Sequence, residues 1–290
     1  MKKYVHELGP LFEAVQMQQI FPDGKTFPDC LPKGDLDDIA QQYAAESQQP
    51  GFDLAAFVAA HFDAPQAEHT DYQSDTSRSA EQHIAALWPV LTRQPDAERG
   101  SSLLPLPHPY IVPGGRFREI YYWDSYFTLL GLRASGRTDL MQHMVDNFAH
   151  LIQHIGHVPN GNRAYYLSRS QPPFFALMVE LLAAEQGEAV WAKYFPHLQR
   201  EHEFWMNGHD RLTPHAPQHR RIVLLPDGSV LNRYWDDYDT PRPESYREDV
   251  ELAHESGRPA AEVYRHIRAA AESGWGYSPP SAPPTSSPLT

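Results

Sequence analysis

In two segments of the chain, aromatic residues alternate with charged and amide side chains. Residues 116–124 read RFREIYYWD, and residues 232–239 read NRYWDDYD. An aromatic ring offers a flat apolar face to the C–H side of a sugar, whereas carboxylate, guanidinium and amide groups fix its hydroxyls by hydrogen bonds. The two segments therefore favour carbohydrate binding. A plainer interpretation stays open at this point, in which the rings fill the core and the charges form ion pairs.

Four of the sixteen histidines, His143, His150, His154 and His157, recur at a spacing that places them within one arc of a helix. Three histidines on one face can ligate zinc. However, this arc lies opposite the apolar stripe of the same segment, and no carboxylate stands in register to orient the rings. We therefore expect a solvated polar face here and no metal site.

Other reactive motifs are weak in this sequence. The pair Gly114 and Gly115 lacks the GxxxxGK(S/T) pattern and the preceding strand of a phosphate loop. A Ser-His-Asp triad stays open, yet no GxSxG element supports one. The single Cys30 excludes an internal disulfide framework and a multi-cysteine zinc site.

The composition is that of an acidic chain that can form a core. Of its 290 residues, 24 are basic and 37 are acidic, which gives a net charge of -13. Such a surface repels phosphate backbones, so nucleic-acid binding is not expected. With 41% hydrophobic residues the chain can fold as one large domain or two small ones. No apolar run reaches the ~18 residues of a membrane span, and the first residues lack the apolar part of a secretory signal. We therefore expect a cytoplasmic protein without membrane contact.

Apolar residues at helical spacing predict the elements that position these side chains. Helices are expected over residues 75–94, 124–135, 138–155, 174–186, 189–195, 197–206, 243–255 and 259–272, and one β-hairpin over residues 221–234. The segment 174–186 is apolar almost all round, which favours a helix covered on both sides. Many paired helices with one hairpin indicate an all-α fold. Three loops rich in Gly, Pro, aromatic and charged residues, 113–124, 158–173 and 232–248, are the expected places of function.

The last residues differ from the rest of the chain. Residues 278–290 read SPPSAPPTSSPLT and carry no charge. A stretch of this kind lacks the apolar residues needed to offset the entropy cost of ordering. We therefore expect a folded domain over residues 1–276 and a disordered tail over residues 277–290.

Residues 113–126, PGGRFREIYYWDSY, resemble the first signature of the trehalases, the glycoside hydrolases that split α,α-trehalose into two glucose molecules. PNGNR at 159–163 with SRSQPP at 168–173 is similar to the next block of that family, and TPRPES at 240–245 and ESGW at 272–275 follow in family order. IFPDGKTFPDC at 20–30 resembles the N-terminal part of bacterial trehalases. The likeness extends from about Leu8 to Trp275 and indicates the bacterial cytoplasmic type.

This resemblance implies an (α/α)6 toroid, in which inner and outer helices alternate around a central funnel that holds the sugar. The family uses no cofactor and inverts the anomeric configuration. One carboxylic acid protonates the glycosidic oxygen while a second carboxylate activates water. By resemblance, the residues that bind trehalose or glucose are Arg116, Trp123, Asp124, Asn160, Arg169, Ser170, Gln171, Arg242, Pro243, Glu244 and Gly274.

The sequence departs from the family pattern at a position that matters for catalysis. The family's general acid is an aspartate directly after Ser-Gly-Trp, and this chain has Gly276 there. Beyond Tyr277 the Pro/Ser/Thr stretch stands in place of further helices that carry the catalytic base. We therefore expect a C-terminally truncated, incomplete toroid without catalytic residues, arising from a frameshift or an early stop and inactive alone.

Three functional hypotheses follow from this departure. The chain is a trehalase remnant that hydrolyses trehalose only when the missing part is supplied, or it is a non-enzymatic trehalose-binding or scaffold protein. In the third hypothesis a neighbouring carboxylate such as Glu272 replaces the acid, which requires it to reach the glycosidic oxygen within about 3 Å. An incomplete toroid also leaves apolar surface uncovered, so self-association is expected.

Overall fold

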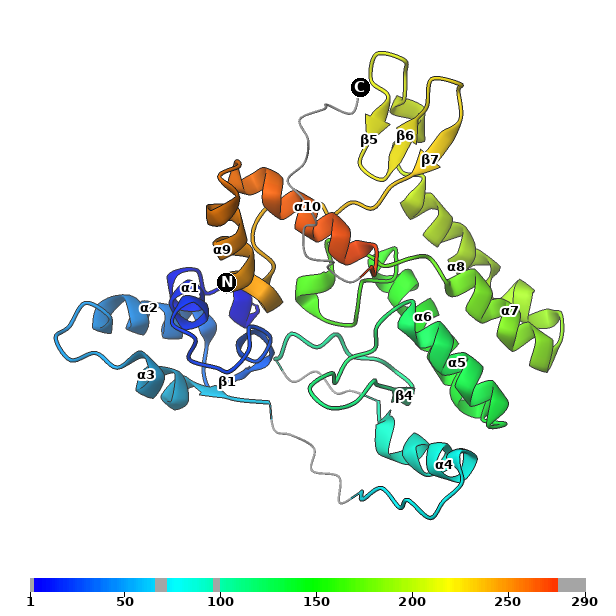
Figure 1. Cartoon of the computed structure of the whole chain (residues 1–290), viewed down its shortest axis with the longest axis horizontal. Coiled ribbons are helices and arrows are strands. Elements are labelled where there is room, and N and C mark those ends of the chain that lie inside the picture. The colour runs from blue at the N-terminus through cyan, green and yellow to red at the C-terminus, as the bar shows by residue number, and fades with distance from the viewer. Residues whose placement is uncertain (1–2, 66–71, 96–99, 276–290) are drawn as a thin grey trace.

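The computed structural model describes residues 3–65, 72–95 and 100–275. The described residues form ten α-helices and three small antiparallel sheets (Figure 1), which confirms the mostly helical fold. The predicted tail, residues 277–290, lies outside the described residues. Within the described ranges, no helix is both long and apolar enough to cross a membrane.

Three helices near the N-terminus form a group that the sequence analysis did not predict. They are α1 (Pro10–Met17), α2 (Leu36–Glu46) and α3 (Leu54–His61). Asp35 and Asp53 cap α2 and α3, because each carboxylate accepts hydrogen bonds from backbone N–H groups of the first turn. The group encloses a core of its own, in which the ring of Phe27 stacks on that of Phe12.

Four helices form a second group: α5 (Asp124–Ala134), α6 (Thr138–Ile155), α7 (Phe175–Gln186) and α8 (Ala189–Trp205). Each packs against the next along the chain, and α5 also packs on α7 and α6 on α8. The predicted range of α6 is confirmed, and Gly156 ends it in the left-handed conformation with φ +102°. Leu177 on α7 is exposed, so the expected cover on both sides of this helix is not found among the described residues.

The prediction of two helices over 189–195 and 197–206 is wrong, because α8 is continuous. Pro196 lies inside it and leaves one carbonyl group without its intrahelical donor. Val190 and Tyr194 before the proline and Trp205 after it are nevertheless buried. Burial of these large side chains outweighs the single lost hydrogen bond.

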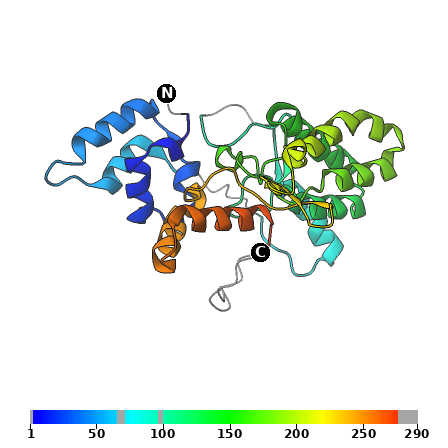
Figure 2. The ribbon, with the colours of Figure 1, turned by 90° about the horizontal axis from the view of Figure 1, so that it is seen from above.

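The pair α9 (Tyr246–Ser256) and α10 (Ala260–Glu272) lies between the two groups (Figures 1 and 2). α9 packs on α1 as well as on α10. It begins later than the predicted residue 243, because Pro243–Ser245 form a 3-10 turn first. α10 runs across the middle of the molecule toward the second group (Figure 2), so its last turn lies near the loops of that group.

The sheets are short. β5 (Gln218–His219), β6 (Ile222–Leu224) and β7 (Val230–Asn232) form a three-stranded antiparallel sheet in that order. The predicted hairpin over 221–234 is confirmed in β6 and β7, and β5 is an additional strand. Two-stranded ladders join β1 (Leu31–Pro32) to β2 (Phe62–Asp63) and β3 (Thr92–Arg93) to β4 (Tyr110–Ile111).

α4 (Ala80–Leu91) is shorter than the predicted range of 75–94. Ser79 caps its first turn in a capping box with Gln82, which fixes the start. The helix ends at Leu91 because the next residues pair as β3 with β4.

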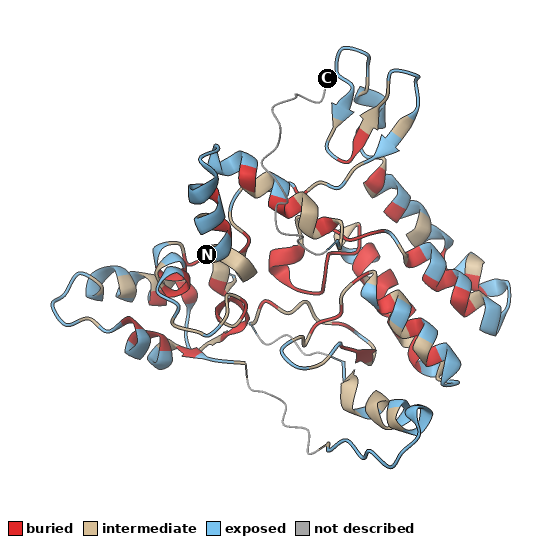
Figure 3. Cartoon of the chain, in the orientation of Figure 1, coloured by how far each residue is buried: buried red, intermediate tan, exposed pale blue. Residues whose placement is uncertain are grey.

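Buried residues gather in two large cores, in a small cluster between α9 and α10, and in the loops between the two large cores (Figure 3). Between the cores, Lys25 and Arg163 are buried together with Asp29 and Glu119, and we call these four residues the charge junction. Lys25 Nζ is 3.0 Å from Glu119 Oε2, and Arg163 lies 3.1 Å from Glu119 and 3.3 Å from Asp29. The two positive and two negative charges compensate one another, as buried charges must. The junction connects the N-terminal group to the loops that lead into α5 and α7.

Candidate functional site

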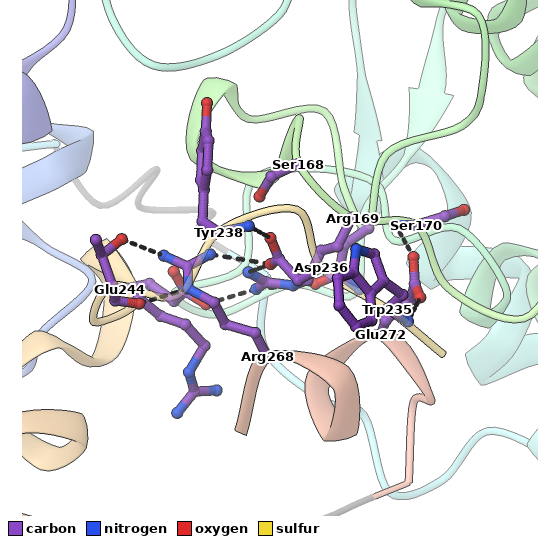
Figure 4. Close-up of polar contacts among 12 residues, drawn as sticks. Ser168, Arg169, Ser170, Trp235, Asp236, Tyr238, Glu244, Arg268 and Glu272 are labelled. Carbon is purple, nitrogen blue, oxygen red and sulfur yellow. Dashed lines mark hydrogen bonds and ion pairs between the residues drawn. The ribbon is translucent and has the colours of Figure 1, made fainter. Parts of the chain in front are cut away.

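Arg169 lies at the centre of the candidate site, fully buried in the loop between α6 and α7. Its guanidinium group is 2.7 Å from Glu244 Oε1, 3.4 Å from Asn160 Oδ1 and 3.5 Å from Asp236 Oδ2 (Figure 4). It also lies over the ring of Tyr166, 5.0 Å from the ring centre. The structure thus brings together three of the predicted residues, Asn160, Arg169 and Glu244, from two loops that are distant in sequence.

Glu244 has one carboxylate oxygen engaged and one free. Oε1 accepts a hydrogen bond from Arg169, whereas Oε2 is buried and has no hydrogen-bond partner among the described residues. Burial disfavours the charged form, but the positive charges of Arg169 and Arg242 outweigh it and hold the pKa of Glu244 below its usual range. Glu244 is therefore a carboxylate with one acceptor oxygen that no described donor satisfies.

Asp236, from the predicted segment 232–239, contacts Arg169, and Arg268, which was not predicted, holds Asp236 in place. Asp236 Oδ2 is 2.9 Å from Arg268 and 3.5 Å from Arg169, and Oδ1 accepts from the backbone N–H of Tyr238 at 2.9 Å (Figure 4). Burial alone would raise the pKa of Asp236. The charges of Arg268 and Arg169 have the larger, opposite effect, so the pKa lies below its usual range. The sequence WDDYD identified the segment around Asp236 as rich in charged residues. No motif in the sequence identified Arg268 on α10 as a residue of the site.

Glu272, at the end of α10, has both oxygens occupied. Oε1 accepts from the backbone N–H of Ser170 at 2.8 Å and from Arg221 Nε and Nη2 at 3.2 and 3.1 Å, and Oε2 accepts from the backbone N–H of Trp235 (Figure 4). Burial raises the pKa of Glu272, and these contacts oppose the rise. The predicted residue Ser170 directs its hydroxyl to the Val158 carbonyl at 2.6 Å. Both side chains therefore hold loops together.

Trp123, Gln171 and Gly274 form a second group of predicted residues. Gln171 Oε1 accepts from the backbone N–H of Trp123 at 3.3 Å. The indole ring packs edge-on against Phe174 and Phe127. Gly274 lies directly against this ring with φ +69°, and a Cβ atom there would be 2.7 Å from the indole. This close approach requires glycine.

Asp124 is the first residue of α5 and lies beside this second group. Partial burial raises the pKa of its carboxyl group, against the effect of hydrogen bonds from its own N–H and from the Gln171 side chain. Gln171 thus contacts both Trp123 and Asp124. An aromatic ring, an amide and a carboxyl group are therefore adjacent at the start of α5.

Arg116 does not reach either group. Its side chain is 60% exposed and forms an ion pair with Asp23 at 3.9 Å. Both residues line a separate cavity of about 260 Å³ together with Arg118. The loop that carries Arg116 turns outward between Gly114 and Phe117, which bond to each other across the turn.

Arg242 and Pro243 flank Glu244 but have partners of their own. Arg242 forms a two-bond ion pair with Asp249, at 2.6 and 2.9 Å. The Pro243 carbonyl accepts from the Gln16 side chain at 2.8 Å. The structure does not place either residue in contact with Arg169, although the charge of Arg242 acts on Glu244.

The prediction of a solvated face for all four histidines is wrong for His157. Because Gly156 ends α6, His157 leaves the helix, and its buried ring stacks on Phe204 at 4.1 Å. The other three histidines are exposed or half-buried. In the part of the chain that the structure describes, no group of three or more His, Cys, Asp or Glu side chains is arranged to hold a metal ion.

The geometry described above, with a buried arginine, a carboxylate with a free oxygen and an aromatic ring beside an amide, suits a polyol ligand. A sequence profile of the trehalases matches residues 19–280, and the chain belongs to the trehalase family of glycoside hydrolases. Among solved structures, the chain is similar to neutral trehalase Nth1 from Saccharomyces cerevisiae, with 32% sequence identity and a TM-score of 0.42. That match covers 58% of this chain and 33% of the yeast chain, so this chain spans about a third of the length of that protein.

Proposed function

We propose that this chain provides one wall of a trehalose-binding site and that it binds the sugar without hydrolysing it. The observation that carries this proposal is the contact of Arg169 with Asn160 and Glu244, in which Glu244 Oε2 has no partner among the described residues. A buried acceptor without a partner costs free energy until a donor meets it. A sugar hydroxyl is such a donor, and membership of the trehalase family favours trehalose as the sugar.

The second group of residues supports the same function. Trp123 offers a flat ring for the C–H face of a pyranose, and Gln171 and Asp124 offer amide and carboxyl groups next to it. The close contact of Gly274 with the indole ring fixes where that ring lies.

A ring of alternating inner and outer helices is the architecture that we propose for the region from α5 to α8. Contacts of α5 with α7 and of α6 with α8, in addition to those between successive helices, support two layers. The loops that lead into α5 and α7 carry Trp123, Asn160 and Arg169, so α5 and α7 belong to the inner layer in this proposal.

Position 276, where the family resemblance places the general acid, supports binding without turnover. General-acid catalysis needs a titratable group within hydrogen-bond reach of the glycosidic oxygen, and Gly276 has none. Glu272 is the carboxyl group nearest in sequence, but Ser170, Arg221 and Trp235 occupy both of its oxygens. Moving Glu272 to serve as an acid would leave the buried Arg221 unpaired, which is costly. We therefore favour binding without turnover over a replacement acid.

Calorimetric titration of the full chain with trehalose, with glucose release measured in parallel, tests this proposal. We expect saturable binding and no glucose. Glu244→Gln removes the charge that strengthens the free acceptor and should weaken binding at least tenfold, because a hydrogen bond to a charged group contributes ~1.5–3 kcal/mol. Arg258→Ala breaks an exposed ion pair with Glu262 and is the control that should leave the affinity unchanged.

Two results would contradict the proposal, each in a different part. If the chain binds neither trehalose nor glucose, the proposed binding function is wrong. Glucose release by the unmodified chain would show turnover, and its loss in Glu272→Gln would then assign the acid to Glu272.

A further inference from the structure

A cavity of about 460 Å³ lies between α7, α8 and the segment that follows β7. Its apolar walls include Pro173 in the loop before α7, Ala176 in the first turn of α7 and Leu198 on α8. The residues predicted to bind sugar do not line it. A cavity of this size suits a small organic molecule, and such sites combine apolar walls with a few polar groups.

Glu201 is a buried carboxyl group in the wall of this cavity. It is 5% exposed, and in the part of the chain that the structure describes its hydrogen bond comes from the Tyr122 hydroxyl to Oε1. The Tyr122 oxygen accepts in turn from the backbone N–H of Phe175 at 2.9 Å. The Tyr122 hydroxyl therefore donates its hydrogen to Glu201 Oε1. No donor among the described residues hydrogen-bonds to Glu201 Oε2.

Trp205 is a second group in the same wall whose polar atom is unsatisfied. It follows Glu201 by four residues, so both lie on one face of α8. Trp205 is 6% exposed, and its Nε1 has no hydrogen-bond partner among the described residues. A buried indole N–H usually has an acceptor. The wall thus presents a carboxyl oxygen without a donor, next to an indole ring over which Arg221 already lies at 5.8 Å.

Among the described residues, no cationic side chain forms an ion pair with Glu201. The titratable or charged side chains that share the cavity are His202, Arg233 and Tyr234. Arg233 is engaged elsewhere, because it donates to the Arg220 carbonyl and to the Gln218 side chain, both at 2.6 Å. Pro173 and Ala176, which α7 and the loop before it contribute, do not titrate. Tyr122, at the start of α5, is the titratable group in direct contact with Glu201.

Burial raises the pKa of Glu201 to about 7, and the hydrogen bond from Tyr122 opposes the rise. The carboxyl group therefore titrates near neutral pH. A carboxylate removed from water is costly unless a cation pairs with it. A ligand that brings a positive charge removes this cost.

We infer that this cavity binds a small organic amine in its protonated form. The ammonium group donates to Glu201 Oε2, and the apolar body of the amine lies against Pro173, Ala176 and Leu198. The net charge of -13 favours the approach of a cation. This inference does not depend on the proposed sugar binding.

Titration of the full chain with 2-phenylethylamine and with its uncharged analogue 2-phenylethanol tests the inference. The amine stays protonated at both pH 6 and pH 8, whereas Glu201 changes from mostly protonated to mostly ionised. The affinity for the amine should therefore rise about tenfold from pH 6 to pH 8, and the affinity for the alcohol should stay constant. Equal affinities for both probes at pH 8, or an amine affinity that does not change with pH, would overturn the inference.

Variants assign the effect to one side chain. Glu201→Gln keeps an acceptor for Tyr122 but removes the charge, so the preference for the amine and its pH dependence should disappear. Glu203→Gln, an exposed neighbour on α8, is the matched control and should change neither. In His202→Gln the affinity for the amine should still rise from pH 6 to pH 8. This result would assign the pH dependence to Glu201 and not to the imidazole of His202.

Ala176→Phe fills the cavity and should abolish binding of both probes, which locates them. Binding of the alcohol by Glu201→Gln shows that this variant retains a folded cavity. If Glu201→Gln does not fold, the two probes at two pH values decide the question on the unmodified chain alone.

Discussion

Burial keeps the imidazole of His157 neutral in the folded chain. Desolvation, together with the nearby charge of Arg221, lowers its pKa to about 3. A histidine in the unfolded chain titrates near pH 6.5, so the unfolded state binds more protons between about pH 3 and 6.5. The stability that this residue contributes is complete above that window and is lost as the pH falls through it.

We predict that His157→Phe reduces the sensitivity of the fold to acid. In the unmodified chain, the free energy of unfolding should fall by about 3 kcal/mol between about pH 7.5 and pH 4.5, because His157 takes up a proton in the unfolded state but not in the folded state. Phenylalanine keeps the stacking on Phe204 without the titration. Urea unfolding at both pH values measures the difference. The exposed His154→Phe should retain the full loss, and an equal loss in His157→Phe would refute the prediction.

Two features of the structure favour glycine at position 274: the positive φ angle of its backbone and the close contact with the Trp123 indole. Gly274→Ala should lower the free energy of unfolding by about 3 kcal/mol, because backbone strain at positive φ adds to a clash with the ring. Gly257→Ala is a matched control, since φ there is +63° but no atom lies within 4 Å of the added Cβ. The control should lose only about 1 kcal/mol in the same urea titration. Equal losses would mean that contact with Trp123 does not constrain this position.

The bounds of the helices could be predicted where several local sequence signals agree. They could not be predicted where contacts between distant residues determine the helix. The range of α6 was predictable because an apolar stripe ends at a glycine stop, Gly156. The break predicted in α8 came from Pro196, while the burial of Tyr194 and Trp205 that overrides it depends on tertiary packing. α3 was missed because its sequence, LAAFVAAH, is apolar on all sides and shows no helical period.

The candidate site was predictable only in part, and for the same reason. Arg169 and Glu244 came from the family resemblance, and no spacing rule joins residues that are 75 positions apart. Asp236 and Arg268 meet across 32 positions, so neither segment alone reveals the pair. Arg116, which the resemblance also implies, lies apart from Arg169 and pairs with Asp23, and its role in sugar binding stays a prediction.

Pro196 makes α8 a helix that a single substitution can strengthen. Pro196→Ala restores a backbone donor at an exposed position and should raise the free energy of unfolding by roughly 2 kcal/mol, after allowance for the greater freedom of the unfolded chain. Urea unfolding measures the gain. Ala192→Ser, at an exposed position one turn earlier, is a control expected to change stability only slightly. A loss in Pro196→Ala would mean that the proline itself is needed for packing.

At the scale of the whole molecule, the charge junction lies between the two large cores, and we predict that it couples them. Burial disfavours ionised Glu119, yet Lys25 and Arg163 hold its pKa below the usual range. Glu119→Gln leaves those two cations under-compensated and should cost roughly 3–5 kcal/mol. Glu262→Gln, in an exposed pair with Arg258, should cost less than about 1 kcal/mol.

The same variant tests whether the two cores unfold together. All six tryptophans lie outside residues 1–65, so their fluorescence does not report on the N-terminal group, whereas far-UV circular dichroism reports on every helix. The two signals should coincide in the unmodified chain and separate in Glu119→Gln. Coincident transitions in the variant would show that other contacts couple the cores.

α10 contacts both loops of the candidate site through two side chains that lie one turn apart. Arg268 contacts Asp236 and the carbonyl groups of Thr240 and Pro241, and Glu272 contacts Ser170 and Trp235. The two positions are separated by about 6 Å along the helix axis. A helix is stiff along that axis, so fluctuations of the two loops are correlated rather than independent. Because Glu272 contacts both loops, the last turn of α10 sets their spacing, and a sliding of α10 would displace both loops at once.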